Sequence, residues 1–351
     1  MTTRTRNLAI GSLLVLFAGL GTGAVAYFGL PISALTAASG PDELKFLPAN
    51  SALVAFVDVH EIMTSELREK LRDALPFNGR GQRTFQDETG INVETDIDRV
   101  VFALTPIDGS EPSAPQGLSV ARGRFDAVRL ESAMRERGAS VEEYKGKRIV
   151  TAPPRSTASA SPQPSPDPST GTTPAPVRRD TLSLSFVEPG LVVVGNTALI
   201  RRAIDLQGGG ESVLSNDNVM GRIKGLEAGN IWAVGRFDAL TLRANLAPGM
   251  VGQLPAITWF AASGQVDSGI RASIKAETRD EASANGLRDI LRGFVAFARM
   301  QAGTRPDLQP LLDTIQIGGN GQTVTLSLDV PPQLFDTLTK SFRPTTPSLP
   351  R

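Results

Sequence analysis

Apolar and polar residues follow one another along most of the chain with the periods of short strands and amphipathic helices. Residues 53–59 form a dense run of apolar and β-branched side chains, which predicts a strand. Both faces of this run are apolar, so we expect it inside a sheet. In residues 181–186, Thr or Ser alternates with Leu or Phe, which is typical of a half-buried antiparallel strand.

Helical periods follow several of the predicted strands. Met63, Leu67, Leu71 and Leu75 recur every fourth residue, which predicts one helical stripe. Asp126 and Gly138 are suitable first and last caps of a second helix, and Asn196 begins a third. The widest apolar stripe predicts a long helix and consists of Leu287, Ile290, Leu291, Phe294, Val295 and Ala298.

The order of these elements predicts an α+β fold in two related units. The first unit covers residues 44–228 and the second covers residues 229–343, followed by a Pro-rich tail at 344–351. Each unit is expected to be a mainly antiparallel sheet with its long helices packed on one face. The segments that match in pattern are 51–63 with 229–241, 117–138 with 269–294, and 180–190 with 322–332.

A polar tract at residues 153–179 interrupts the first unit. Pro, Ser, Thr and Ala dominate it, so it has too little apolar surface to offset the entropy lost on ordering, and we expect disorder. The tract stands between two predicted strands, and we interpret it as a long loop within one domain instead of an interdomain linker. Loop closure costs only about 0.6 kcal/mol per doubling of length, so the sheet tolerates it.

Residues 8–30 contain no charged side chain. At roughly 1.5 Å per residue, a helix of this length exceeds the roughly 30 Å of a bilayer's hydrocarbon core. A secretory signal usually has an apolar region of only about 7–15 residues, so a retained transmembrane anchor is the preferred interpretation. Cleavage near Ala37, Ala38 and Ser39, whose side chains are small, is the alternative.

The flanks of this segment predict its orientation. Arg4 and Arg6 precede it, whereas Asp42 and Glu43 follow it, and positive charge stays on the cytoplasmic side. We therefore expect residues 1–40 to hold a cytoplasmic tip, a single-pass membrane anchor and a short linker, with the bulk of the chain on the outer side of the membrane. A Gly19–Gly23 pair would allow a homodimer of anchors, although several other glycines lie nearby.

Composition narrows the classes of function. The chain of 351 residues has 36 basic and 36 acidic residues, few aromatic residues, one His and no Cys. Balanced charge and scarce aromatics argue against a nucleic-acid partner. Without Cys there is neither a disulfide framework nor a thiolate metal site, and one His excludes a His-rich zinc site.

The side chains that most resemble catalytic groups have simpler interpretations. His60 follows a predicted strand and is expected to lie at the surface. Ser119 stands in Gly-Leu-Ser-Val-Ala, which resembles the start of a nucleophile elbow but lacks its final Gly and the turn into a helix, so we interpret Ser119 as a strand residue. Asp96 and Asp98 lack the further oxygens of a calcium loop, so turn or cap roles are expected.

A pair of glutamates and two glycine runs are also unsuitable as functional sites. Glu142 and Glu143 are adjacent in a short predicted strand and should point to opposite faces, which is unsuitable for an acid–base pair. The glycine runs at 208–210 and 318–321 lack the Lys-Ser or Lys-Thr of a phosphate loop. Helix termination and a hairpin turn at Asn320-Gly321 explain them. We therefore assign no catalytic, cofactor-binding or metal-binding residue.

Three stretches carry a family resemblance. In order behind the predicted anchor, residues 47–59, 88–104 and 192–205 resemble a group of bacterial membrane-anchored envelope proteins classified as a domain of unknown function. The resemblance covers about residues 44–206. It implies an exported bacterial protein, which would place the anchor in the bacterial inner membrane and the bulk of the chain in the periplasm or outside. It supplies neither a substrate nor site residues.

These observations lead to one preferred function and two alternatives. We expect a non-catalytic binding or scaffolding module, held at the membrane by residues 8–30, whose partner is another envelope protein. No cofactor is predicted. The first alternative is an envelope enzyme with an unfamiliar carboxylate-based site, and the second is a structural spacer.

Overall fold

The computed structural model describes residues 41–69, 86–87, 90–106, 116–153, 182–238, 256–303 and 309–335. The predicted anchor at 8–30, nearly all of the tract at 153–179 and the tail at 344–351 lie outside these residues. Among the described residues, no helix is both long and apolar enough to cross a membrane.

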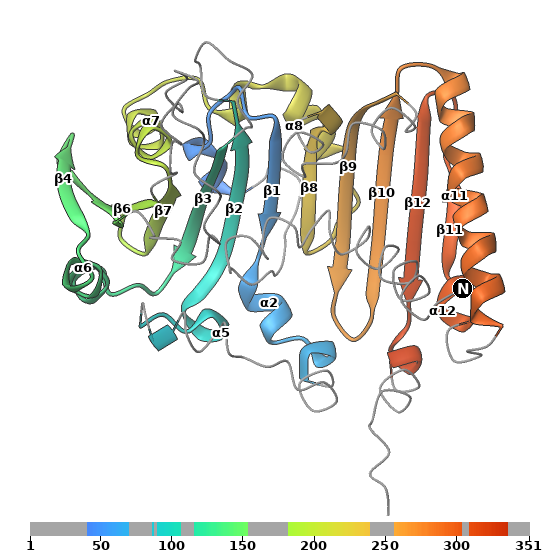
Figure 1. Cartoon of the computed structure of the whole chain (residues 1–351), viewed down its shortest axis with the longest axis horizontal. Coiled ribbons are helices and arrows are strands. Elements are labelled where there is room, and N and C mark those ends of the chain that lie inside the picture. Colours follow the sequence, from blue (N-terminus) through green and yellow to red (C-terminus); the bar gives the residue numbers. More distant parts are fainter. Residues whose placement is uncertain are drawn as a thin grey trace, which may run out of the picture.

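The described strands form a single twelve-stranded sheet in which every neighbouring pair is antiparallel (Figure 1). The strand order is β11-β12-β10-β9-β8-β1-β2-β3-β7-β6-β5-β4. The predicted α+β class with an antiparallel sheet is therefore confirmed. The strands are β1 (Leu53–Val57), β2 (Ile97–Thr105), β3 (Gln116–Gly123), β4 (Ser140–Tyr144), β5 (Lys147–Thr151), β6 (Ser183–Glu188), β7 (Leu191–Gly195), β8 (Ile231–Arg236), β9 (Ile257–Val266), β10 (Ile270–Thr278), β11 (Ile315–Gly318) and β12 (Thr323–Val330).

Helices lie against the sheet and at its ends (Figure 1). The α-helices are α2 (Val59–Met63), α5 (Val93–Asp96), α6 (Ala127–Glu136), α7 (Thr197–Gln207), α8 (Asp217–Lys224), α11 (Glu281–Ala302) and α12 (Gln309–Asp313). Two short 3-10 helices are η1 (Asp42–Phe46) and η2 (Val213–Ser215).

Strand β1 lies at the centre of the sheet, as its two apolar faces predict. It pairs with β2 on one side and with β8 on the other. The β1–β8 register runs from Leu53 opposite Gly235 to Val57 opposite Ile231. Phe56 and Trp232 are opposite each other in this pair, and their rings stack with centroids 5.8 Å apart. The pair therefore joins residues 41–228 to residues 229–335 through both backbone and side chains.

The strand order outward from this pair is similar on the two sides. β2, β3, β7 and β6 follow on one side, and β9, β10, β12 and β11 follow on the other. Both predicted units thus contribute to one continuous sheet instead of forming two. One proposed match needs correction: because β7 pairs with β3 and β12 pairs with β10, the strand within 322–332 occupies the position of β7, not that of β6.

The two faces of the sheet are packed differently. We call the face that carries Val54, Phe56 and Val120 the first face. In the half built from β1–β7 it is covered by η1, α7 and α8, which bury Phe46, Ile200 and their neighbours against it. The opposite, second face carries Val100, Ala121 and Val192 and packs against α2 and α6. The expectation that helices share one face is therefore wrong for the first unit.

The alternating pattern of β6 and the apolar stripe of α11 predicted burial only in part. Ser183 and Ser185 are fully buried, because α7 covers the side of β6 that alternation assigned to solvent. In α11, Leu287, Leu291 and Val295 are buried or partly buried, and Leu287 and Leu291 pack in a cluster with Val324 of β12. The same helix leaves Ile290, Phe294, Phe297 and Met300 exposed, with Phe294 54% and Met300 68% accessible. Strand β6 is thus buried on both faces, and the α11 stripe is wider than its contact with the sheet.

Local capping signals were reliable. The side chains of Asp126 and Asn196 accept hydrogen bonds from the backbone N–H groups of Arg129 and Leu199 and so begin α6 and α7. Gly138 follows the last cap of α6 with φ of 87°, a conformation that favours glycine. The stripe beginning at Met63 is interrupted, because α2 ends there and helix resumes at residues 66–69, while Leu71 and Leu75 lie outside the described residues.

A buried carboxylate ties η1 to the sheet. The side chain of Glu43 is fully buried, and its Oε1 lies 3.2 Å from Arg99 Nε and accepts a hydrogen bond from Arg122 Nε. Arg122 also approaches Glu188, which is paired with Lys45 at 3.0 Å. Removing one partner from such a buried group is costly, because the remaining charges lose their compensation.

We expect Glu43→Ala to lower the free energy of unfolding by about 3 kcal/mol, because it leaves Arg99 and Arg122 without their shared counter-charge. The adjacent and exposed Asp42 provides the control, and Asp42→Ala should change stability by less than about 0.5 kcal/mol. Urea titration of the two variants measures both values. Equal effects at the two positions would show that the Glu43 network contributes no stability.

Candidate functional site

The structure separates the three side chains considered first for catalysis. His60 is exposed on α2. Ser119 is buried in the middle of β3 between Phe102 and Val194, as a strand residue. Asp96 ends α5, and its carboxylate accepts hydrogen bonds from Asn92 N at 2.8 Å and Thr95 Oγ1 at 2.9 Å. Among the described residues, no hydrogen bond joins any two of His60, Ser119 and Asp96.

The remaining sequence candidates have structural roles. Asp98 lies in β2 beside an irregularity in its pairing with β3. Glu142 forms an ion pair with Arg201 of α7 at 2.8 Å, while Glu143 is exposed. The glycines at 208–210 end α7, and those at 318–321 turn β11 into β12 with φ of 98° at Gly319 and 54° at Gly321. The described part of the chain holds no group of three or more His, Asp or Glu side chains that would bind a metal.

A charged cluster beside α2 was not apparent from the sequence. Asp58 begins α2 by accepting a hydrogen bond from Glu61 N at 3.3 Å. Burial is the largest influence on its carboxyl group and raises the pKa of Asp58, although that hydrogen bond and the charge of Arg99 act in the opposite direction. The Glu61 carboxylate accepts hydrogen bonds from Asn230 and Gln265 at 3.3 and 3.2 Å. Glu61 therefore attaches α2 to the second half of the sheet.

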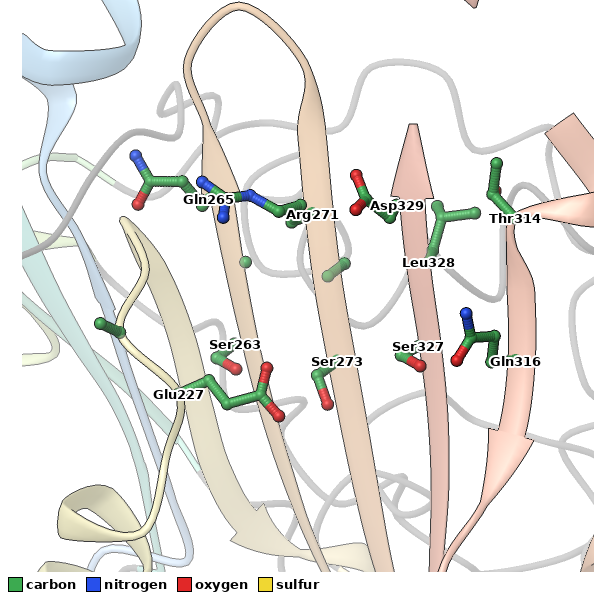
Figure 2. A pocket seen from close by; sticks show the side chains of 13 residues that line it. Glu227, Ser263, Gln265, Arg271, Ser273, Thr314, Gln316, Ser327, Leu328 and Asp329 are labelled. Atoms are coloured by element: carbon green, nitrogen blue, oxygen red, sulfur yellow. The ribbon is translucent and has the colours of Figure 1, made fainter. Parts of the chain in front are cut away.

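A polar depression occupies the first face in the second half of the sheet. Its volume is about 270 Å³. β9, β10, β12 and β11 form its floor, Glu227 and Ala228 lie along one side, and Thr314 and Gln316 lie along the other. Figure 2 shows Ser263, Ser273, Ser327 and Gln316 side by side across these four strands. The strand register explains this row, because each of the four residues is directly opposite the next.

The polar groups of this row have no partners within the described residues. Ser263 and Ser273 are only 7% and 5% exposed, Ser327 is half-buried and Gln316 is exposed. The Oγ of Ser273 is inaccessible to solvent and makes no hydrogen bond in the described part of the chain. Buried hydroxyl groups are normally hydrogen-bonded, as Ser183 is to Thr197 at 2.9 Å. The floor of the depression therefore includes a hydroxyl group whose hydrogen-bonding capacity is unused among the described residues.

Charged residues border the row on both sides. Arg271 and Asp329 are opposite each other on β10 and β12, and Arg271 also lies 3.5 Å from Asp267. Figure 2 shows Gln265 and Arg271 above the serine row, and Glu227 beside Ser263 and Ser273. The described residues of the lining include one basic and two acidic side chains. This arrangement favours neutral hydrogen-bonding groups over anions.

A second hollow lies at the other end of α8 and is less suited to a ligand. Its lining includes Asn216, Arg236 and Trp259. Asn216 caps α8 and donates to Ala49 O at 2.8 Å, and Arg236 is paired with Asp238 at 3.0 Å. The guanidinium of Arg222 lies over the Trp259 ring, 4.1 Å from its centroid. These groups are already engaged, so the polar depression is the stronger candidate.

Comparisons with known proteins add little to this geometry. No family model matches the chain, and no curated protein matches it. Two similar solved structures are crystal forms III and I of TP0453, with TM-scores of 0.48 and 0.45 and sequence identities of 6% and 8%. They cover 86% and 87% of this chain and 100% and 98% of their own chains. Likenesses this distant carry no argument about function.

The raised pKa of Asp58 has a consequence for stability. A carboxyl group whose pKa is raised on folding contributes stability below its ordinary pKa, and this contribution is lost as pH rises through the folded value. Asp58→Asn keeps the capping oxygen but does not titrate. We therefore expect Asp58→Asn to gain stability relative to the natural chain as pH increases from about 3 to about 7. Urea titrations across this range measure the difference, and a constant or falling difference would contradict the assignment.

Proposed function

We propose that this protein is a binding module tethered to the bacterial envelope, and that the polar depression on β9, β10, β12 and β11 is its binding surface. One observation carries the proposal: a row of neutral polar side chains that have no hydrogen-bond partners among the described residues lies on the floor of a depression. Ligand sites typically combine a concave surface with a few convergent polar groups. The tether is the apolar segment at residues 8–30, which would confine the module to the membrane surface and raise its effective concentration there.

The likeness between the two halves supports a specialised role for this surface. We infer two related units that share the order β1-β2-β3 and β8-β9-β10, each followed by a helix on the second face, α6 or α11. In the first unit, α7 covers the outer strands of the first face. At the corresponding position of the second unit, the described strands form the floor of the depression. The first unit, which is covered by α7, would have a structural role, and the second unit would bind the ligand.

An envelope enzyme is the second candidate. Its support is Asp58, whose raised pKa is a property expected of a general acid. The Asp58 carboxylate is, however, also the cap of α2. A catalytic role for Asp58 predicts that Asp58→Asn abolishes the protein's function in the cell while the fold remains intact. The binding proposal predicts that cellular function is kept in this variant.

The absence of Cys from the chain allows a direct test of the binding surface. A single Cys at Gln316, labelled with a benzophenone maleimide in intact envelopes, should give a crosslinked adduct on illumination. Val128, 77% exposed on α6 and on the other face of the sheet, is the matched control and should give none. The Gln316 adduct should also decrease when Ser263 and Ser273 are both replaced by Ala.

A further single-Cys variant, at Thr3, tests the tether and its orientation together with the variant at position 316. A membrane-impermeant maleimide should label Cys at position 316 from the outside but not Cys at position 3, and the chain should stay in the membrane fraction at full mass. A mature N-terminus near Ala38 or Ser39 would contradict the retained anchor. Equal adducts at positions 316 and 128, or none at 316, would contradict the proposed binding surface.

A further inference from the structure

We infer that the ligand of the polar depression is a neutral, polyhydroxylated chain, a short oligosaccharide, that lies across the strands along Ser263, Ser273, Ser327 and Gln316. This inference rests on the proposed function, because it names the class of ligand for the same site. It follows from the chemistry of the row, its spacing and the charges around it.

The chemistry of the row matches hydroxyl groups. A serine hydroxyl donates one hydrogen bond and accepts others, and the Gln316 amide both donates and accepts. Sugar hydroxyls have the same dual character, so each ring can satisfy a side chain in either direction. The Ser273 Oγ has no partner in the described part of the chain and is inaccessible to solvent, so a ligand hydroxyl reaches it only after rotation about χ1 of Ser273. Leaving such a group unpaired costs free energy that a hydroxyl-bearing ligand would recover.

The spacing of the row matches a repeating ligand. Neighbouring strands lie about 4.8 Å apart, so the four side chains form a line of roughly 14 Å perpendicular to the strands. This step is close to the length of one pyranose ring along an extended, β-linked glycan. An extended peptide instead pairs through its backbone with a sheet edge, and this row lies on a sheet face.

The surrounding charges and apolar groups exclude other classes of ligand. Arg271, the single basic side chain among the described lining residues, already faces Asp267 and Asp329, so these residues offer an anion such as phosphate no free counter-charge. Among the described residues, the apolar side chains of the lining are Ala228, Ala272 and Leu328, which is too little apolar surface for a lipid chain. The described lining contains no aromatic ring for a sugar to stack on. Hydrogen bonds must therefore supply the affinity, and a dissociation constant in roughly the millimolar range is expected.

The test is a titration of the full-length, detergent-solubilised protein with cellotetraose and with N-acetylchitotetraose, followed by calorimetry and saturation-transfer NMR. Inorganic phosphate and a Gly-Ser tetrapeptide are the comparison probes. We expect one or both saccharides to bind and the comparison probes not to bind. Replacing Ser263 and Ser273 together by Ala should weaken saccharide binding on the order of tenfold, because two hydrogen bonds are lost.

Two further variants separate binding from folding. Ser327→Ala and Gln316→Ala alter the less buried end of the row and should also weaken binding. Thr325→Ala, on the same strand as Ser327 and outside the depression, should leave binding unchanged. Urea titration of every variant identifies any loss of binding that comes from unfolding.

The outcomes distinguish this inference from the proposed function. If neither saccharide binds but the Gln316 crosslink persists, the ligand class is wrong and the binding surface stands. If both binding and crosslink are absent, both proposals fail. Undiminished saccharide binding by the serine variants would place the glycan elsewhere on the protein and overturn the inference. Binding of the peptide or of phosphate in place of the saccharides would overturn it as well.

Discussion

The pairing of β1 with β8 is the interaction on which the rest of the structure depends. It supplies the backbone partners along one edge of each half and buries Phe56 against Trp232 on the first face. Without this pairing, β1 and β8 would each become an exposed edge strand, and the unpaired N–H and C=O groups of such an edge favour association with other chains. The pair also aligns the first faces of both halves, so that α8 on the first half leads directly into Glu227 and Ala228 at the side of the polar depression.

The two halves use the same face of this sheet in different ways. In the first half, apolar side chains of β1, β2, β3 and β7 meet helices and form the main core. In the second half, the corresponding positions of β9, β10 and β12 carry Ser263, Ser273 and Ser327. An apolar face needs a cover, whereas a face of hydroxyl groups can meet water or a polar ligand. The difference in side chains therefore explains why we assign stability to one half and binding to the other.

Sequence patterns predicted the features that depend on neighbouring residues. The central place of β1 follows from its two apolar faces, and the starts of α6 and α7 follow from Asp126 and Asn196. Features that depend on distant partners were not predicted. The burial of Glu43 requires arginines from β2 and β3, and the burial of Ser183 and Ser185 requires α7 above them. The polar row joins two hairpins, β9–β10 and β11–β12, through the pairing of β10 with β12, and this long-range pairing has no local signal in the sequence.

Hydrogen–deuterium exchange of the full chain tests the central claim, that the β1–β8 pair makes the two halves one body. If the claim holds, amides of β1 and β8 are the slowest to exchange and do so together with those of β2 and β9, at the rate of global unfolding. Addition of denaturant should lower their protection in parallel. Exchange of the β8–β12 half well before β1–β7, with β1 protected while β8 is not, would show two independent domains and contradict the account.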